Sequence, residues 1–464
     1  MLLELAEKAV RMAIDLGAEY SDVRAEQIYS TATRLTNDRF EQAISGIDQG
    51  LGVRALYKGA WGFSSTTSLE MKDIKVAVQN ALKTAKATSK GVKEKAELHH
   101  IKPVKDHVIV KAREPLAKIG IDKKMKQVLH LSDVVRGYSP KIVSANLIYE
   151  DGAGQRAVTT SDGAKILTEA SRVYVSITAV AKEAEKITSC RERMGKPAGF
   201  ELFKDVNIDE LAEKAARRAV NLLAAKPAPS GRFTVVADPK LAGVFAHEAV
   251  GHAAEADLVI AGESILAGKI NSKVGSELVS MYDDSTLSGG WGSEKYDDEG
   301  VPTKKRLLID RGILKGLINN KEAAAKLNMK PNGGARVQNF SHRPIVRMSN
   351  TYITKGDHTF EELLEDIHKG VYLKGTRGGQ VDTAKGTFQF NAEEAYLIKK
   401  GQVTAPLLDV SLSGLTLETL HSIDAVGDEI ELGMGFCGKS AQTVPVGMAS
   451  PHVRIKNALV GGRA

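Results

Sequence analysis

A stretch rich in proline and glycine at residues 227–231, Pro-Ala-Pro-Ser-Gly, divides the 464-residue chain into two halves. Proline fixes φ and lacks a backbone donor, so neither a helix interior nor a central strand is expected to run through this stretch. A chain of this length also exceeds the roughly 100–200 residues of one ordinary domain. We therefore place the main domain boundary at residue 227.

The first half of the chain has an α+β pattern. Apolar residues recur at helical spacing over residues 2–14, Gly17 is placed as a C-cap, and a second amphipathic stretch begins near Ser68. Between these two helices, residues 22–63 contain two or three strand-like segments punctuated by glycines. Because helix, strands and helix follow one another, we predict a first α+β subdomain at residues 1–90.

Residues 91–226 are predicted to form a second α+β subdomain, so that the N-terminal region is a two-layer α/β structure in two parts. Its last helix has a capping box, because Asn207 is followed three residues later by Glu210. The elements expected here are a helix at 122–135, strands at 142–149, 155–160 and 166–181, and a helix from Asn207.

Positive charge is concentrated in one segment of this region. Residues 83–126 contain thirteen Lys/Arg and five Asp/Glu, an excess of eight that accounts for the whole net charge of +7. A basic segment is compatible with nucleic-acid binding. This one has no aromatic residue for base stacking, and the chain shows no helix-turn-helix, zinc-finger or RNA-binding motif. We interpret it as a solvated connector, and nucleic acid is an unlikely partner.

The composition is typical of a globular protein in the cytoplasm. No run of about 18 apolar residues predicts a membrane span, and an acidic residue, Glu4, enters too early for a secretory signal. The two cysteines, Cys190 and Cys437, are too few for a disulfide framework, which fits a reducing compartment.

Residues 227–464 are predicted to form a strand-rich, catalytic C-terminal domain, with a further helix at 360–369. The domain opens with a short strand at 233–237. Asp238 then has the character of an N-cap, and Pro239 occupies the first helical position. The helix that begins here carries the chemistry.

His247, Glu248 and His252 lie on this predicted helix. Two imidazoles and a carboxylate are the ingredients of a zinc hydrolase, in which the metal activates a water and the carboxylate takes its proton. Histidines five positions apart are separated by about 140° on a regular helix, too far to share one ion. A π-type turn, which closes i to i+5, brings them together. We therefore predict an irregular turn before His252, favoured by the flexibility of Gly251.

A catalytic zinc usually has three protein ligands, so a third is needed. Cys437 is flanked by glycines that allow close backbone approach, and Lys439 would favour its thiolate. Cys190 has no such setting. The alternative role of Cys437 is that of a small buried apolar residue. The candidate third ligands are Glu255, Asp257, His421, Cys437 and His452.

At these residues the chain resembles the TldD/PmbA family, and specifically its metal-bearing TldD branch. The family signature, His-Glu, three residues, His, two residues, Glu, one residue, Asp, is matched by His247, Glu248, His252, Glu255 and Asp257. Other segments similar to TldD lie at residues 52–54, 62–63, 297–300, 347–351, 434–439 and 444–447, so the resemblance covers essentially the whole chain.

The resemblance implies a zinc metallopeptidase that hydrolyses short or unfolded peptides. It implies that His247, His252 and Cys437 hold the zinc and that Glu248 is the general base. It also implies a dimer, formed either with a second copy or with a metal-free sister subunit.

The remaining motif residues have two interpretations each. Glu255 or Asp257 would accept hydrogen bonds that orient the histidines, or would end the helix. In the segment 347–351, the candidate residues are Arg347, Asn350 and Thr351. These side chains would either line a substrate cleft or pack within strands. The rival functions are a non-catalytic regulatory or scaffold subunit and, with less support, a nucleic-acid-binding protein.

Overall fold

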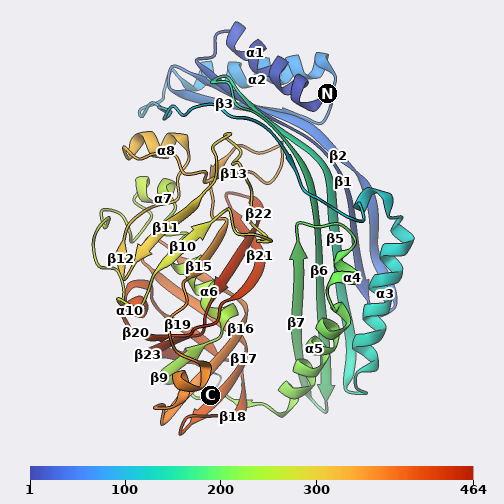
Figure 1. Ribbon diagram of the computed structural model, residues 1–464, viewed down its shortest axis with the longest axis vertical. Coiled ribbons are helices and arrows are strands. Elements are labelled where there is room, and N and C mark those ends of the chain that lie inside the picture. Colours follow the sequence, from blue (N-terminus) through green and yellow to red (C-terminus); the bar gives the residue numbers. More distant parts are fainter. Residues whose placement is uncertain (463–464) are drawn as a thin grey trace.

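The computed structural model describes residues 1–462, and its N-terminal half is built on one seven-stranded sheet that bends over the C-terminal domain (Figure 1). The strand order is β3-β2-β1-β5-β6-β4, and β7 also pairs with β6. The strands are β1 (Tyr20–Thr36), β2 (Arg39–Tyr57), β3 (Ala60–Thr66), β4 (Lys105–Ile109), β5 (Ile142–Thr160), β6 (Lys165–Glu183) and β7 (Lys186–Lys196).

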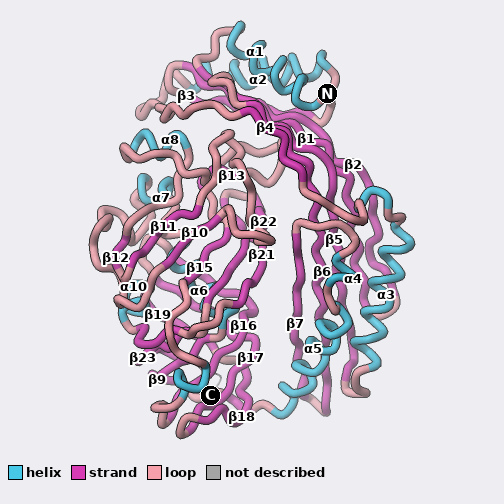
Figure 2. Tube along the Cα trace, in the orientation of Figure 1, coloured by secondary structure: helices cyan, strands magenta, loops and turns pink. Residues whose placement is uncertain are grey.

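The long helices of this half pack on one face of the sheet in two apolar clusters (Figure 2). α1 (Leu2–Asp15) and α2 (Met71–Thr88) cover one end, whereas α3 (Ile121–Gly137) and α5 (Ile208–Asn221) cover the other. The shorter helices here are η1 (Leu116–Lys118), α4 (Leu202–Asp205) and η2 (Leu222–Ala224). The opposite face of the sheet is left for the C-terminal domain.

Most of the predicted N-terminal elements are confirmed, but the break predicted between two strands at residues 149–155 is wrong. Asn207 caps α5 by accepting the amide of Glu210, as its sequence context predicts. The predicted strands at 142–149 and 155–160 are one continuous strand, β5, because its central glycines do not break it. A Cβ at Gly154 would lie 2.0 Å from the Gln27 carbonyl oxygen, so this glycine allows β5 to lie close against β1.

The pairing of β1 with β5 joins residues 1–90 and 91–226 in a single sheet. The boundary between two subdomains therefore stays a prediction, supported by the two separate apolar clusters. The basic segment crosses this boundary as the end of α2, an extended stretch, β4 and the start of α3. Its side chains are largely exposed, but Lys124 is buried and pairs with Asp151 at 2.6 Å.

The C-terminal half contains two larger sheets around one apolar core. In the first, β16, β9, β23, β19 and β17 follow one another, and β17 pairs back to β16, which closes a ring. The strands of this sheet are β8 (Lys226–Pro227), β9 (Gly231–Ala237), β16 (Lys369–Asp382), β17 (Thr387–Lys399), β18 (Gln402–Leu408), β19 (Ser411–Leu415), β20 (Ile423–Val426) and β23 (Val453–Gly461).

The second sheet has six strands in the order β12-β11-β10-β15-β22-β21, so β21 lies at an edge. Its strands are β10 (Met281–Asp284), β11 (Lys305–Asp310), β12 (Ile313–Leu314), β15 (Asn350–Ile353), β21 (Glu431–Lys439) and β22 (Gln442–Ser450), and a small separate pair is formed by β13 (Ala335–Arg336) and β14 (Ile345–Val346).

The helix α6 (Pro239–Phe245) packs between these two sheets and continues into a π-helical turn, η3 (Ala246–Gly251). The predicted helix at 360–369 is shorter than expected, because β16 begins at Lys369, but its capping box of Thr359 and Glu362 is confirmed. The remaining helices are α7 (Ala256–Ile260), α8 (Lys321–Lys326), α9 (Phe360–Leu364) and α10 (Thr416–His421). No helix in residues 1–462 has the length and hydropathy needed to cross a membrane.

Ion pairs, one buried and one partly buried, join the two halves at one end of their contact. Arg54 of β2 binds Glu299 at 2.7 Å, and Arg156 of β5 binds Asp298 at 3.0 Å. Further along, β7 faces β21 without pairing to it (Figure 1). Both are edge strands of their sheets, and the space between them leads toward the motif helix.

Candidate metal centre

The helix that carries the histidines begins as its sequence predicts. Asp238 accepts the amide of Leu241 at 2.8 Å, and Pro239 occupies the first turn. Burial raises the pKa of Asp238 to about 6, although the amides of Leu241 and Gly375 oppose this shift. The cap fixes the residue at which α6 starts, eight residues before His247.

The predicted irregular turn is present. From Ala246 the helix widens into a π turn, and the amide of His252 donates to the carbonyl of His247 at 3.1 Å, an i to i+5 bond. Gly251 does not have a positive φ, so its predicted flexibility is not needed for a left-handed conformation here. A Cβ at this position would lie 2.1 Å from Met348 Sδ, so the glycine also leaves room for the segment between β14 and β15 behind the turn.

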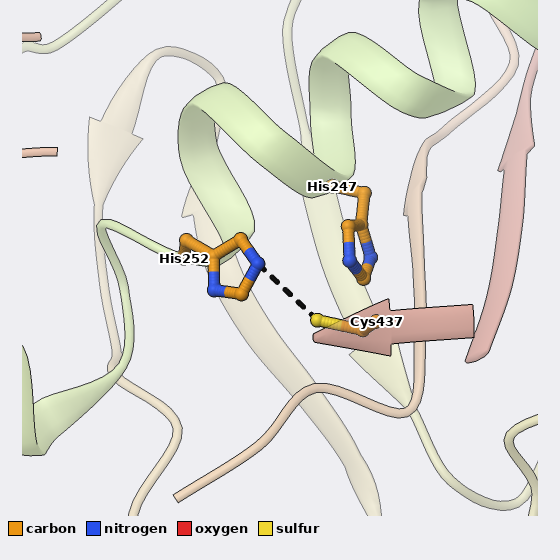
Figure 3. Close-up of side chains that lie close together, drawn as sticks. All are labelled: His247, His252 and Cys437. Carbon is orange, nitrogen blue, oxygen red and sulfur yellow. Dashed lines mark hydrogen bonds between the residues drawn. The ribbon is translucent and has the colours of Figure 1, made fainter. Parts of the chain in front are cut away.

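His247, His252 and Cys437 converge at this turn (Figure 3). Their ligand atoms all lie within 4.8 Å of one another, and Cys437 Sγ is 3.2 Å from His252 Nε2. The two imidazole rings are 5.3 Å apart at an interplanar angle of 78°. The thiol comes from β21, whose pairing with β22 places Cys437 opposite Val444.

The donor set fits a transition metal. Both ring nitrogens of His247 are buried and have no hydrogen-bond partner in the described part of the chain, which is costly for a polar side chain unless something else binds it. Two imidazoles and one thiolate are ligands that zinc accepts, and three protein ligands leave a position for substrate or water. Within residues 1–462, no other group of three such side chains is close enough to hold an ion.

Electrostatics in the site favour the thiolate. Burial raises the pKa of Cys437, but the nearby His247 and His252 outweigh it and lower the value to about 5. Burial lowers the pKa of His252, and the adjacent Glu255 carboxylate more than compensates, raising it well above the ordinary value. Because the thiolate is the form that binds metals, this pairing prepares Cys437 as a ligand.

A carboxylate and a lysine support His252 from behind. Glu255 Oε2 lies 2.9 Å from His252 Nδ1, which directs Nε2 toward Cys437. Lys439 Nζ contacts Glu255 at 3.0 Å and Asp257 at 2.8 Å. Lys439 is therefore engaged by these two carboxylates, rather than by the thiolate as the sequence suggests. Asp257 holds Lys439, and Glu255 is the carboxylate that contacts a histidine.

Glu248 lies on the open side of the cluster. Its Oε2 is 3.7 Å from His252 Nε2, and its side chain is 36% exposed, in contrast to the buried His247 and Cys437. A carboxylate beside the ligand atoms and in contact with solvent can reach a water molecule at the site.

Comparison with known proteins agrees with this geometry. Three domain profiles match the chain: PmbA/TldA metallopeptidase domain 1 at residues 21–85, the central domain at 114–223 and the C-terminal domain at 230–462. The chain belongs to the PmbA/TldD family. This family is described as one of metallopeptidases, and the proposed ligands all lie within its C-terminal domain.

Relatives of this PmbA/TldD protein carry metalloprotease names. A metalloprotease of Methanothermobacter thermautotrophicus is 42% identical over 456 residues, 98% of each chain. A zinc metalloprotease TldD homolog of Saccharolobus solfataricus is 29% identical over 98% of this chain and 99% of its own.

Solved structures show the same fold. TldE from Thermococcus kodakarensis superposes with a TM-score of 0.80 at 18% identity, covering 99% of this chain and all of its own. A Thermotoga maritima protein named as a modulator of a DNA gyrase gives 0.80 at 22% identity, with the same coverage. Both confirm the mixed α and β architecture predicted from the sequence.

Other candidate residues of the PmbA/TldD chain lie away from the site. His452 binds the hydroxyl of Tyr372 at 3.0 Å, and His421 is exposed on α10. Neither belongs to the cluster of His247, His252 and Cys437.

The segment 347–351 is buried rather than exposed in a cleft, which favours the strand-packing interpretation. Arg347 donates to the carbonyl oxygens of Cys437 and Gln442, and so holds β21 and β22. Asn350 donates to Ser293 Oγ at 2.9 Å. Thr351 is fully buried within β15. The support that Arg347 gives to the backbone of Cys437 has no signal in the sequence, because it depends on a contact 90 residues away.

Proposed function

We propose that this PmbA/TldD protein is a zinc-dependent peptidase that hydrolyses short or unfolded peptides. The observation that carries the proposal is the convergence of two imidazoles and a low-pKa thiol, with both nitrogens of His247 buried and unpartnered. The Saccharolobus relative, which is named a zinc metalloprotease, supports the choice of metal.

In this mechanism His247, His252 and Cys437 hold the metal, and Glu248 handles the proton. Zinc, when bound, supplies Lewis-acid polarisation of water and of the scissile carbonyl. Glu248 accepts the proton of the attacking water and passes it to the leaving amine. Its partial exposure, beside ligand atoms that are buried, suits this role. Glu255 keeps Nε2 of His252 directed at the site through its bond to Nδ1.

The substrate is proposed to bind as an added strand at the edge formed by β21. Within the described chain, β21 pairs on one side only, with β22. A free strand edge offers backbone donors and acceptors to an extended peptide whatever its side chains. Since Cys437 lies on this strand, a peptide paired with it would pass the metal ligands. A strand of a folded protein is held in its own sheet, so this binding mode would favour short or unfolded chains.

The protein is proposed to act in the cytoplasm as a dimer, formed with a second copy or with a metal-free sister subunit. The structural similarity to TldE is the observation that favours a subunit partnership. In such a pair this chain would be the catalytic member, because it retains all three candidate ligands.

Elemental analysis of the purified protein, combined with digestion of a peptide library, tests the proposal. We expect one zinc per chain, hydrolysis of unstructured peptides, and loss of hydrolysis on chelation that zinc restores. Metal-free protein that hydrolyses peptides equally well would contradict the mechanism. Stoichiometric zinc without hydrolysis of any peptide would favour the regulatory or scaffold alternative.

A further inference from the structure

A cavity of about 370 Å³ lies between the two halves of the molecule, against α6, which leads into the π turn, and β21, which carries Cys437. Its walls come from β7, α5, α6, β16 and β21. Val244 of α6 and Met434 of β21 both line it. Glu248 follows Val244 by four residues, in the π turn, and Cys437 follows Met434 by three residues, on the opposite face of the strand. The cavity is therefore bordered by the two elements that lead to the candidate metal centre, and none of the proposed ligands lines it.

The lining of this cavity is unusually rich in positive charge. Five basic side chains face three acidic ones, which leaves an excess of two positive charges. The basic residues are Arg191, Arg193, Lys214, Lys240 and Arg377, and the acidic ones are Glu192, Glu393 and Glu431.

Two of the three carboxylates are already engaged. Glu192 binds Lys240 at 3.0 Å and also pairs with Lys214 and Arg218. Glu393 binds Arg218 at 2.8 Å. Burial raises the pKa of Glu192, but these cations outweigh it and keep the value below the ordinary one.

The guanidinium groups of three arginines of the cavity have no carboxylate partner within residues 1–462, although the backbone amide of Arg191 donates to Glu393 Oε1 at 2.8 Å. Arg191 Nε donates to Thr178 Oγ1 at 3.1 Å, and Arg377 contacts only the carbonyl of Ser189, at 3.4 Å. The side chain of Arg193 makes no hydrogen bond or ion pair in the described chain, and it is exposed. These guanidinium groups are available to a ligand.

Two of these arginines project toward β21. The register of β6 and β7 places Arg191 opposite Thr178 and Arg193 opposite Ser176. They therefore share the sheet face of Tyr174, since residues directly opposite lie on the same side. The ring centroids of Tyr174 and of Phe436 on β21 are 5.2 Å apart. The sheet face that carries Tyr174, Arg191 and Arg193 is therefore directed toward β21.

The facing strand presents an apolar stripe. Leu432, Met434 and Phe436 alternate along β21, and Leu432 and Phe436 are 45% and 46% exposed. Successive side chains of a strand point to opposite faces, so these three share one face, whereas Cys437 points to the other. The cleft thus has a basic wall on β7 and an apolar wall on β21.

We infer that this cleft, called here the arginine cleft, is a subsite that selects extended peptides carrying acidic side chains next to apolar ones. The inference rests on the proposed peptidase function, which it deepens by naming a substrate class. A peptide paired with β21 would place its apolar side chains on the stripe of Leu432 and Phe436. Its Asp or Glu side chains would meet Arg191 and Arg193 across the cleft, a few residues from the scissile bond.

Peptide binding to the Glu248→Gln protein tests the inference without turnover. Fluorescent peptides of equal length and equal apolar content would carry Glu, Gln or Lys at the same positions. We expect the Glu peptide to bind about tenfold more tightly than the Gln peptide at low salt, and the Lys peptide most weakly. The preference should shrink with added salt, because exposed charges are screened over about 8 Å at physiological ionic strength.

The double substitution Arg191→Gln and Arg193→Gln, in the same background, should remove most of this preference. The matched control is Arg11→Gln with Arg39→Gln, which removes two exposed arginines away from the cleft. It should leave the preference unchanged. Equal binding of all three peptides to the Glu248→Gln protein would overturn the inference even if the double variant failed to fold. A preference equally sensitive to the control substitutions would overturn it as well.

Turnover by the wild-type protein separates this inference from the proposed function. Hydrolysis of Glu and Gln peptides with the same kcat/KM would refute the arginine cleft and leave the peptidase standing. Selective binding of Glu peptides, lost in the Arg191/Arg193 variant but without hydrolysis of any peptide, would support the cleft and refute the peptidase.

Discussion

The two cysteines of this chain are both buried, yet their surroundings give them opposite chemistry. At Cys437, burial raises the pKa, but two histidines lower it to about 5. At Cys190, burial raises the pKa to about 12, and the opposing effect of Arg218 is offset by Glu393 and Glu394. Burial alone therefore does not make a cysteine a metal ligand. The neighbouring groups decide it, and within residues 1–462 only Cys437 has imidazoles that can bind the same ion.

Both cysteines pack in apolar clusters, but their neighbours differ. Cys190 belongs to the cluster that α3 and α5 form against the N-terminal sheet, and it lines the arginine cleft. Cys437 belongs to the apolar core of the C-terminal half, on an edge strand beside the π turn. The two histidines within reach of its thiol suit the position of Cys437 to a ligand.

The largest expected effect that distinguishes the two cysteines is on metal content. Cys437→Ser should weaken zinc binding by more than about 100-fold, since the loss of a ligand exceeds the 10–100-fold cost of losing a supporting group. Cys190→Ser, the matched control, should keep full zinc content and lose only some thermal stability. Competition titration with a zinc chelator measures both. Equal zinc affinity in the two variants would break the comparison.

A second prediction separates metal binding from chemistry at the Cys437 site. Glu248→Gln should keep the zinc and lower kcat by about 10²- to 10⁴-fold, the range for loss of a general base. Glu394→Gln, beside Cys190, should change thermal stability and leave kcat within about twofold, because its carboxylate pairs with Arg218 and accepts the Tyr396 hydroxyl, both away from the metal centre. Steady-state kinetics with zinc analysis checks both variants. Wild-type turnover by Glu248→Gln would remove Glu248 from the mechanism.

A third prediction concerns the carboxylates around His252. Glu255→Gln should reduce zinc affinity by about 10- to 100-fold, because the hydrogen bond to Nδ1 weakens. Asp257→Asn should have a smaller effect, since Asp257 reaches His252 only through Lys439 and Glu255. The same chelator titration ranks them. A larger loss in Asp257→Asn would reverse the order expected from the contacts.

The smallest effect is a spectroscopic one in metal-free protein. With a pKa of about 5, Cys437 is a thiolate at neutral pH, and its ultraviolet thiolate absorbance should disappear as the pH falls through about 5. Cys190, with a pKa of about 12, is a thiol throughout this range and should contribute nothing. Cys437→Ser should therefore abolish the transition and Cys190→Ser should keep it. A transition that persists in Cys437→Ser would contradict the assignment.

Much of the local structure around the site follows from local sequence. The five-residue spacing of His247 and His252 predicts the π turn, because only a widened turn aligns both rings. Asp238 and Pro239 predict the start of the helix. The glycines beside Cys437 distinguish it from Cys190 without any knowledge of the fold.

Contacts between distant segments could not be predicted in this way. The sequence places Lys439 near Cys437, but its carboxylate partners come from the end of the motif segment, 184 and 182 residues away. Matching a motif also does not reveal exposure, and so Arg347 was a candidate cleft residue although it is buried behind β21. The arginine cleft depends on the register of β6 with β7, and the sequence analysis predicts a strand only for the first of these two segments.

Anomalous diffraction at the zinc edge, from crystals of protein purified without added chelator, tests the central claim most directly. The account predicts one peak, about 2.0–2.1 Å from a nitrogen of His247 and of His252 and about 2.3 Å from Cys437 Sγ. A peak held by other side chains, or none in a crystal grown with zinc, would contradict it.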